Sequence, residues 1–252
     1  DKHTFSFDSS HLQSTVPDSE QAKQIRGSFL LAGPLLARKN SIDLPAPGGD
    51  RIGLRPVHTH LLALEKLGAK ISLDKKGLYK MRTAGLKGTD IYLDEASVMA
   101  TENAVMAAVT AQGKSSIYNA ACEPHVQGLC HFLVKLGAKI EGIGSNLLII
   151  EGVKSLAGAD YTIQPDHTEV GSFIGLAAVT RSELRIKNAG VKYLNMTRLM
   201  FEKLGIEIQV EGDDILIPKK QKLCVQKEVQ GGIPKIDDSP WPGFPADLTS
   251  IM

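Results

Sequence analysis

Lys66-Leu67-Gly68 is the clearest guide to the architecture of this chain, because the tripeptide returns twice further along. It recurs as Lys135-Leu136-Gly137 and as Lys203-Leu204-Gly205, first 69 and then 68 residues later. A fixed spacing of this size is the sequence signature of a repeated structural unit. We therefore expect the chain to contain copies of one unit of about 69 residues.

A helix is predicted before each of these three glycines. Apolar residues seven and three positions apart lie on one face of a helix, and each copy has such a triplet. The triplets are Val57, Leu64 and Leu67; Val126, Leu133 and Leu136; and Leu194, Phe201 and Leu204. The glycine that follows each triplet suits the end of a helix, because glycine tolerates a positive φ angle. We therefore expect the three helices to bury corresponding faces.

Strands are predicted after each glycine, where the apolar residues begin to alternate with polar ones. These strands are 71–73, 140–142 and 206–210, and turn residues lead to second strands at 147–150 and 215–217. Upstream, helices at 103–111 and 170–178 precede strands at 116–118 and 184–186. Each unit thus has the order strand, helix, strand, helix and β-hairpin. This order predicts an α/β (α+β) fold in which repeated βαβαββ units pack around shared helices.

The composition is that of an ordinary globular protein of 252 residues, long enough for one large domain or two smaller ones. A formal net charge of +1 gives no basic excess for binding nucleic acid. No apolar run approaches the roughly 20 residues of a membrane-spanning helix, and residues 1–10 show no secretory leader. Cys122, Cys130 and Cys224 cannot all pair and lack metal-ligand spacing. We therefore expect a cytoplasmic protein that binds neither nucleic acid nor membranes.

Two segments rich in glycine and arginine resemble the active-site region of the enolpyruvyltransferases that act on UDP-N-acetylglucosamine. They are Arg26-Gly-Ser-Phe-Leu-Leu-Ala-Gly-Pro34-Leu-Leu-Ala-Arg38 and Pro47-Gly-Gly-Asp50-Arg-Ile-Gly-Leu-Arg55-Pro-Val57. Later segments also look like that family: residues 96–98 with 101–103, Asn119-Ala-Ala-Cys-Glu-Pro124, Gly137-Ala-Lys-Ile140-Glu-Gly142, Pro165-Asp-His-Thr-Glu169-Val-Gly171 and Pro240-Trp-Pro-Gly-Phe-Pro245-Ala-Asp247. The resemblance extends from about Arg26 to the last residue.

The resemblance implies two lobes, each an inside-out α/β barrel of three βαβαββ units. On that pattern, residues 1–165 form the first lobe, with units ending near residues 90 and 164 and the first unit largely missing. Residues 166–252 form part of an incomplete second lobe. The family's lysine-asparagine start and its final arginines have no match here, so we also expect a chain that lacks both family ends.

The resemblance also implies a reaction. Members of the family move the enolpyruvyl group of phosphoenolpyruvate onto the 3′-hydroxyl of UDP-N-acetylglucosamine, which opens the synthesis of peptidoglycan precursors. The reaction is an addition followed by elimination of phosphate. It needs a proton donor for the methylene carbon, a base for the sugar hydroxyl, and cations around phosphate and carboxylate. We expect these two substrates as partners, with no cofactor and no metal ion.

Asp50 is the predicted proton donor, at a loop position where many family members carry a cysteine. Because a free aspartate titrates near pH ~3.9, burial in a closed site would have to raise the pKa of Asp50. From the residues alone, Asp50 could equally be a solvated turn residue after Gly48 and Gly49. The antibiotic fosfomycin alkylates the family's cysteine, so the resemblance implies that this chain is insensitive to it.

Asp247 is the predicted base, because its segment matches the one whose aspartate contacts the sugar hydroxyl in the family. From the residues alone, it could equally be a carboxylate that stabilises the start of a helix. Similarly, Asp166 and Glu169 could line the cleft or cap the helix that follows them.

Arg26 and Arg55 are predicted to bind substrate, because a guanidinium is a planar donor that matches phosphate oxygens. The resemblance assigns Arg26 to the substrates and starts a nucleotide-binding run at Arg55. That run continues through Pro56, Val57, His58 and Thr59, and a second nucleotide-binding segment consists of Ser97, Val98 and Met99. Either arginine could instead be a solvated residue at a helix end, and Ser97 could serve as a helix N-cap. His58 and His60 are two positions apart, so they make a poor metal pair.

Three residues depart from the commoner residues of the family. Glu95 replaces a lysine, Met99 a glycine and His167 an arginine. Two further functions stay open beside the transferase reaction. One is a non-catalytic fragment that binds a nucleotide sugar, and the other is an enolpyruvyltransferase that acts on shikimate 3-phosphate. The oligomeric state is also open.

Overall fold

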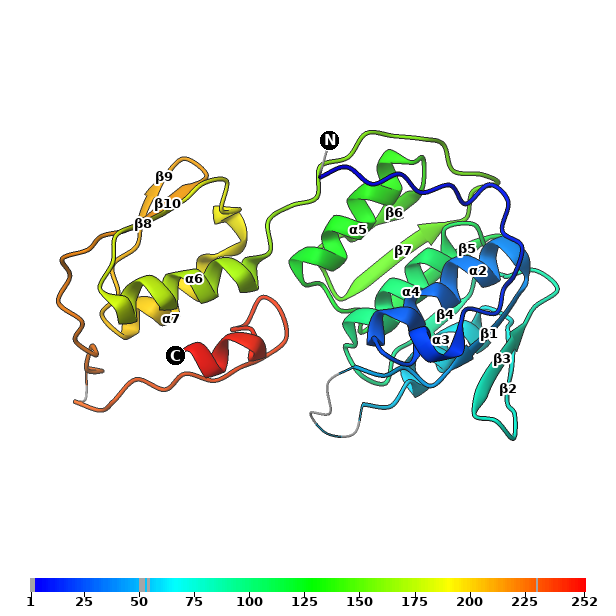
Figure 1. The fold of residues 1–252 in the computed structure, drawn as a ribbon, viewed down its shortest axis with the longest axis horizontal. Helices are drawn as coiled ribbons and strands as arrows, with labels where there is room; N and C mark the ends of the chain where they lie inside the picture. The colour runs from blue at the N-terminus through cyan, green and yellow to red at the C-terminus, as the bar shows by residue number, and fades with distance from the viewer. Residues whose placement is uncertain (1–2, 50–52, 54, 230) are drawn as a thin grey trace. The chain divides into compact units, whose positions relative to one another are not determined.

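The computed structural model describes residues 3–49, 53, 55–229 and 231–252, and the chain forms two compact units (Figure 1). Unit 1 comprises Asp1–Ala120, Leu136–Gly142 and Asn146–Gly158, and unit 2 comprises Ala121–Lys135, Ile143–Ser145 and Ala159–Met252. The lobe boundary after residue 165 stays a prediction. Asp50, the expected proton donor, lies outside the described residues.

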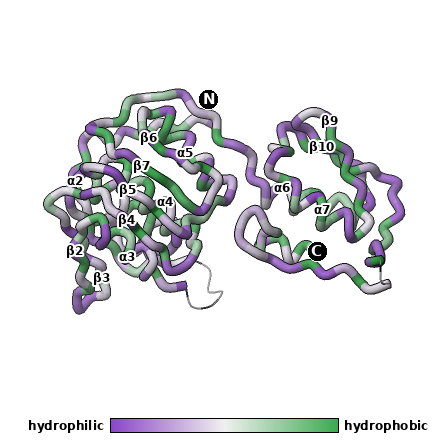
Figure 2. Tube along the Cα trace, turned by 180° about the vertical axis from the view of Figure 1, so that it is seen from behind, coloured by the Kyte–Doolittle hydropathy of each residue, from purple (hydrophilic) through white to green (hydrophobic). Residues whose placement is uncertain are grey.

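The strands of unit 1 form two sheets. In the first, β3 (Leu78–Arg82) lies between β1 (Ser41–Pro45) and β2 (Lys70–Leu73), and both pairs are antiparallel. The second has the order β4 (Asp90–Tyr92), β5 (Lys114–Tyr118), β7 (Leu147–Glu151) and β6 (Lys139–Glu141). Within this sheet β4 and β5 are parallel and the other pairs antiparallel. Figure 2 shows the hydrophobic residues along β7, whose Leu148 and Ile150 are buried.

The helical part of unit 1 consists of α1 (Ser19–Ala22), the 3-10 turn η1 (Arg26–Leu31), α2 (Ala32–Lys39), α3 (His58–Lys66) and α4 (Val98–Ala108). The helix α4 packs against both α2 and α3. Seven of its eleven residues are buried, so it has no wide solvent face. A helix buried on most of its sides is the shared interior element that the repeat predicts.

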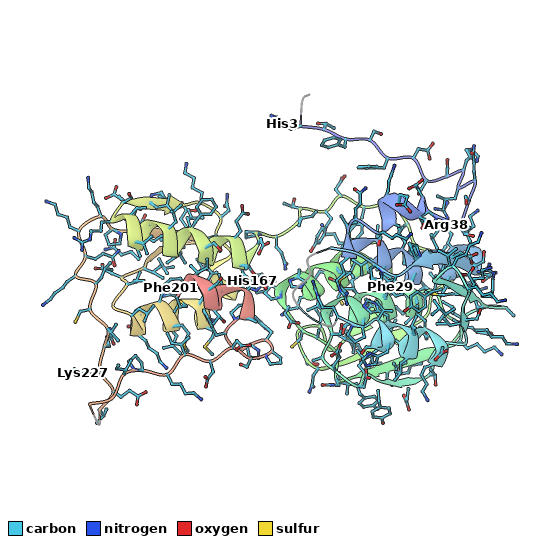
Figure 3. The ribbon with its side chains drawn as sticks, turned by 60° about the horizontal axis from the view of Figure 1, so that its bottom comes forward. His3, Phe29, Arg38, His167, Phe201 and Lys227 are labelled. Carbon is cyan, nitrogen blue, oxygen red and sulfur yellow. The ribbon has the colours of Figure 1, made fainter. Side chains whose placement is uncertain are left out.

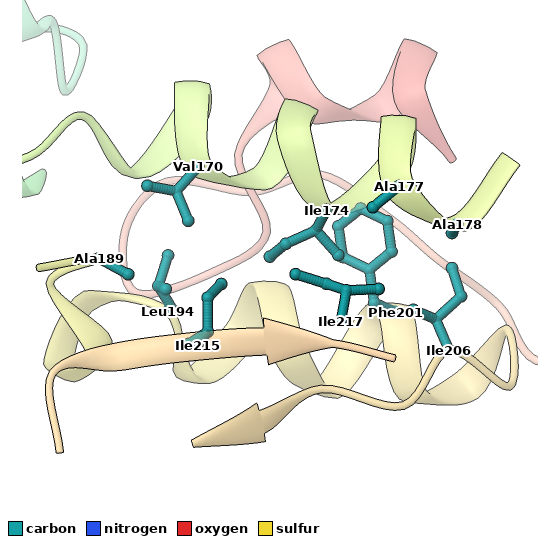
Figure 4. Close-up of a cluster of buried hydrophobic side chains, with 10 residues drawn as sticks. All are labelled: Val170, Ile174, Ala177, Ala178, Ala189, Leu194, Phe201, Ile206, Ile215 and Ile217. Atoms are coloured by element: carbon teal, nitrogen blue, oxygen red, sulfur yellow. The ribbon is translucent and has the colours of Figure 1, made fainter. Parts of the chain in front are cut away.

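Unit 2 contains α5 (Pro124–Lys135), α6 (His167–Thr180), η2 (Val191–Tyr193), α7 (Asn195–Lys203) and η3 (Ala246–Ile251). Its sheet places β10 (Asp214–Ile217) between β8 (Leu184–Ile186) and β9 (Gln209–Glu211), again antiparallel. Figure 4 shows Ile174 of α6, Phe201 of α7 and Ile215 of β10 meeting in one apolar core. Among the described residues, no helix combines the length and the hydrophobicity that a membrane crossing requires.

The three hairpins confirm the predicted repeat. In each sheet the second hairpin strand lies between the first hairpin strand and the strand upstream, giving β1-β3-β2, β5-β7-β6 and β8-β10-β9. Gly68, Gly137 and Gly205 have φ angles of 100°, 103° and 80°, the left-handed backbone that the C-cap prediction requires. The mixed α/β class and the order of elements are therefore confirmed.

The strand predicted at 206–210 is wrong in its first half. The Ile206 amide donates to the carbonyl of Phe201 at 3.1 Å and so closes the end of α7. The Glu207 amide donates to the Gln221 side chain at 2.8 Å. Because these donors are already used, the strand ladder begins only at Gln209.

The helix predicted at 103–111 is displaced toward the N-terminus. It begins at Val98, because the Ser97 side chain caps it by accepting a hydrogen bond from the Ala100 amide. It ends at Ala108, and the Ala111 amide then donates to the Ala108 carbonyl at 3.0 Å in a tight turn.

Gly33 in α2 approaches α4 so closely that a methyl group has no room. A Cβ atom at this position would lie 2.5 Å from the Asn103 carbonyl oxygen. We expect Gly33→Ala to lower the free energy of unfolding by about 2 kcal/mol, although alanine favours a helix more than glycine does. The matched control is Gly27→Ala, since a Cβ there would meet nothing within 4 Å. Denaturant unfolding measures both variants, and equal stability of the two would contradict the close approach.

Candidate functional site

A cavity of about 670 Å³ in unit 1 is lined by three cationic residues. Its lining consists of Lys23, Arg26, Ala46, Pro47, Gly48, Gly49, Gly53 and Arg55. The two arginines that the sequence predicts as substrate ligands thus share one pocket, and Lys23 joins them. The two arginines favour an anionic ligand at this cavity, because each can donate a charge-assisted hydrogen bond to an oxygen. The ammonium of Lys23 lies 3.2 Å from the Glu20 carboxylate.

Arg26 holds the chain that leads into α3. Its Nη1 donates to the carbonyl of Arg55 at 2.9 Å and its Nη2 to the carbonyl of Pro56 at 3.2 Å. The pKa of Arg26 lies below its ordinary value, mainly because partial burial disfavours the charged form and also because Arg55 is near. The guanidinium remains charged, as arginine does in proteins. An anion bound between the two arginines would relieve their repulsion.

The glycines before Asp50 pack directly against the segment that carries these cations. A Cβ atom at Gly48 would lie 1.5 Å from the Lys23 carbonyl oxygen, and one at Gly49 would lie 3.3 Å from the Arg26 amide nitrogen. Gly49 also has a φ angle of 95°. Glycine at both positions therefore lets the loop approach the backbone at Lys23 and Arg26, and this wall of the pocket depends on it.

Two helix N-termini carry the predicted nucleotide-binding segments. The helix α3 begins at His58 after Val57, whose side chain makes no capping hydrogen bond. The helix α4 begins at Val98 after its cap Ser97, and Val98 and Met99 are half-buried in its first turn. The alternative role of Ser97 as an N-cap is thus observed. The first amides of a helix have no partner within the helix and point toward bound anions.

Asn103 joins these segments from inside unit 1. It is fully buried, and its Nδ2 donates to the carbonyl of Phe29 in η1 at 2.9 Å. Its Oδ1 accepts from the Gly33 amide at 2.8 Å. Its Nδ2 also lies 2.9 Å from Nδ1 of His60 in α3. One amide side chain of α4 therefore binds η1, α2 and α3.

His60 is a neutral, buried member of this network. Its ring meets Phe29 edge-on, with the centroids 5.1 Å apart (Phe29 is labelled in Figure 3). Burial, followed by the nearby charge of Arg26, lowers the pKa of His60 to about 4. The described residues contain no group of three histidine, cysteine or acidic side chains that could hold a metal ion.

The remaining predicted residues lie in unit 2. Asp247 is exposed in the 3-10 turn η3, and its role as a base stays a prediction. Asp166 caps α6, because its Oδ1 accepts from the Thr168 amide at 2.8 Å and the Glu169 amide at 3.3 Å. His167, labelled in Figure 3, is buried edge-on against Trp241 at 5.7 Å. Burial, and then the neighbouring His125, lowers the pKa of His167.

The sequence reasoning missed Lys23, Asn103 and Asp94. Asn103 has a recognisable signal, since it is a polar residue on the buried side of an otherwise apolar helix. Asp94 accepts a hydrogen bond from the Thr59 hydroxyl at 2.7 Å and lies 2.6 Å from Nε2 of His58. Its signal is weaker, a carboxylate just ahead of a helix that already has its own cap at Ser97. Lys23 has no local signal, because Gly48 approaches its backbone carbonyl across 25 positions of the chain.

Comparison with known proteins places this chain among enolpyruvyl transferases. The family profile described as EPSP synthase (3-phosphoshikimate 1-carboxyvinyltransferase) matches residues 1–252. A UDP-N-acetylglucosamine 1-carboxyvinyltransferase of Bradyrhizobium diazoefficiens is 54% identical over 250 residues, which cover 99% of this chain and 58% of that protein. One of Treponema denticola is 52% identical over 252 residues, covering 100% and 59%. The chain therefore spans somewhat over half the length of these relatives.

Solved structures show the same fold at lower identity. The enolpyruvyl transferase NikO from Streptomyces tendae has a TM-score of 0.67 at 21% identity, covering 80% of this chain and 49% of its own. An EPSP synthase from Acinetobacter baumannii has a TM-score of 0.57 at 22% identity, covering 75% and 45%. At this identity the likeness concerns the fold alone.

Stability should depend on pH through His60. Because its pKa of about 4 in the folded chain lies below the ordinary 6.5, the unfolded chain binds a proton first as the pH falls. The contribution of neutral His60 to the free energy of unfolding is complete above pH 6.5. It is lost as the pH falls toward 4, by about 3 kcal/mol in all. Urea unfolding between pH 6.5 and 4 should show a smaller loss of unfolding free energy in His60→Gln than in the unmodified chain. His167 is present in both proteins, so an equal loss in both would contradict the assignment to His60.

Proposed function

The chain belongs to the EPSP synthase family of enolpyruvyl transferases, and on that premise we propose that it acts as a UDP-N-acetylglucosamine 1-carboxyvinyltransferase. It would transfer the enolpyruvyl group of phosphoenolpyruvate to the 3′-hydroxyl of the sugar nucleotide. The product would enter peptidoglycan synthesis, and we propose a cytoplasmic location for this step. Relatives named for this activity are 44–54% identical to the chain, which supports this acceptor.

The cationic pocket of Lys23, Arg26 and Arg55 is the observation that carries the proposal. Both substrates are anions, one with a phosphate and a carboxylate and the other with a diphosphate. Arg55 lies at the pocket and also begins the chain segment that enters α3. It can therefore bind a phosphate oxygen while the first amides of α3 and α4 bind others.

Two carboxylates would move protons in this reaction. As the acid, Asp50 would protonate the methylene carbon of phosphoenolpyruvate while the sugar hydroxyl oxygen bonds to the neighbouring carbon. As the base, Asp247 would accept the proton of that hydroxyl. Loss of a methyl proton and of phosphate from the tetrahedral intermediate would then restore the double bond. The pocket cations would stabilise the charge on the carboxylate and on the departing phosphate.

A second acceptor, shikimate 3-phosphate, is favoured by the description of the matching family profile. Shikimate 3-phosphate contains neither a nucleotide nor a diphosphate. It would therefore offer no nucleotide for the predicted binding segments at the starts of α3 and α4. Binding measurements with both compounds separate the two functions. Phosphate release from phosphoenolpyruvate that depends on the acceptor distinguishes an enzyme from a protein that only binds the nucleotide sugar.

UDP-N-acetylglucosamine should raise the thermal unfolding midpoint of the chain, because a ligand that binds only the folded state stabilises it. Arg55→Gln should weaken this binding about 10- to 100-fold, since it removes a charge-assisted hydrogen bond. Arg38→Gln is the matched control, because Arg38 is exposed in the last turn of α2 and does not line the pocket (Figure 3). A midpoint that shikimate 3-phosphate raises and UDP-N-acetylglucosamine does not would overturn the proposed acceptor.

Asp50→Cys should make the chain reactive toward fosfomycin in the presence of UDP-N-acetylglucosamine, since a thiolate attacks the electrophile that a carboxylate resists. Intact-mass measurement detects the adduct, with one adduct expected in the variant. The unmodified chain is its own control, because Cys122, Cys130 and Cys224 occur in both proteins. Covalent modification at Asp50 of the unmodified chain would refute this role of the loop.

A further inference from the structure

One face of α6 carries a histidine followed by two glycines. His167, Gly171 and Gly175 are four positions apart, so they lie one after another along the same side of the helix. All three are buried. Another part of the chain therefore covers this face, and glycine at two of its three positions lets that part come close to the helix backbone.

The turn before η3 is fixed at the first of these positions. The ring of Trp241 meets that of His167 edge-on, with the centroids 5.7 Å apart, and also meets the ring of Tyr193 at 6.2 Å. The turn itself is closed by the Ser239 amide, which donates to the Phe244 carbonyl at 3.0 Å. Trp241 is thus held against α6 and η2 on a turn that has its own hydrogen bond.

The 3-10 turn η3 is fixed at the two glycines. A Cβ atom at Gly171 would lie 2.5 Å from Cδ1 of Leu248, and one at Gly175 would overlap Cγ2 of Ile251. Leu248 is fully buried, and it also packs in one cluster with Phe244. Figure 4 shows η3 alongside α6. The side chains of η3 therefore rest directly on the backbone of α6.

Asp247 lies between these anchors along the chain. It precedes Leu248 directly and follows Trp241 by six positions. Because Asp247 is itself exposed, burial of its own side chain does not hold it in place. Its position along α6 is therefore set by the contacts of the residues on either side of it.

We propose that this face of α6 is a positioning surface that holds Asp247 where it can accept the proton of the sugar hydroxyl. The face acts through the segment that covers it. It favours one register of that segment, because the positions next to both glycines carry side chains. A base needs such a hold, since a displacement of about 1 Å can cost most of its rate. This inference rests on the proposed function, because it concerns the predicted base of the same reaction.

Hydrogen–deuterium exchange measures the hold on η3 without any ligand. Gly171→Ala keeps α6 helical, because alanine favours a helix more than glycine does, but its methyl group displaces Leu248. The amides of η3 should exchange about tenfold faster in this variant, because opening them costs less free energy. Ser172→Ala is the matched control on the same helix, since the Ser172 hydroxyl bonds within α6, and it should leave this exchange unchanged. Unchanged exchange in Gly171→Ala would overturn the inference.

Two substitutions of Trp241 examine the other anchor. Trp241→Ala removes the ring that meets His167 and should also speed the exchange of η3. Trp241→Phe keeps an aromatic ring at the same place, so it should recover most of the protection. Equal exchange in Trp241→Ala and the unmodified chain would contradict a hold through this ring.

Steady-state kinetics separate positioning from a merely structural role. In phosphate release that depends on UDP-N-acetylglucosamine, Gly171→Ala and Trp241→Ala should lower kcat about tenfold, since a displaced base meets the hydroxyl in poor geometry. The KM for the sugar nucleotide should stay within about twofold, because the predicted phosphate ligands Arg26 and Arg55 are unchanged in unit 1. Trp241→Phe should recover most of the kcat, and Ser172→Ala should keep it.

The two proposals fail in different ways. Release by the unmodified chain with an unchanged kcat in Gly171→Ala and Trp241→Ala would overturn positioning and leave the proposed function standing. A KM that rises as kcat falls would place the effect in substrate binding and would overturn positioning as well. No release by the unmodified chain would overturn the proposed transfer, and the positioning of Asp247 with it.

Discussion

The candidate site depends on the hydrogen bonds of one buried side chain, that of Asn103. Its contacts with Phe29, Gly33 and His60 join the interior helix α4 to η1, α2 and α3. Leaving a buried polar group without its partner costs about 1–3 kcal/mol, so these groups stabilise the structure only as a set. Because η1 begins with Arg26 and α3 with His58, the same contacts position the backbone that carries these side chains of the site.

The repeat supplies the scaffold and leaves the chemistry to residues that do not repeat. Ser97 and Asp166 are 69 positions apart, and each caps a central helix, α4 or α6. The residue of α6 that corresponds to Asn103 is Ser172, whose hydroxyl bonds to the Thr168 carbonyl of its own helix at 3.0 Å. The same position of the repeat thus joins several helices in unit 1, whereas in unit 2 its side chain bonds within its own helix. Repetition of the backbone therefore does not imply repetition of function.

Positive charge gathers at one pocket of this protein, although the chain as a whole is nearly neutral. The formal net charge is +1, yet Lys23, Arg26 and Arg55 line one pocket. Arg26 and Arg55 lie together because Arg26 binds the carbonyls of Arg55 and Pro56, and Gly48 lets the loop touch the Lys23 carbonyl. The arginine expected to contact substrate therefore also shapes the pocket, since its five N–H donors allow both.

The sequence by itself determined what depends on neighbouring residues. Helical spacing, alternation and glycine at the helix ends predicted the repeat, its hairpins and the left-handed residues at Gly68, Gly137 and Gly205, because these features arise within a few residues. Arg26 and Arg55 were also recognisable, from the resemblance of the segments around them. Only the tertiary structure decided the rest. Asn103 contacts residues 43 to 74 positions away, and Asp94 meets Thr59 across 35 positions. Contacts over such distances exist only after the helices have packed, so no local pattern encodes them.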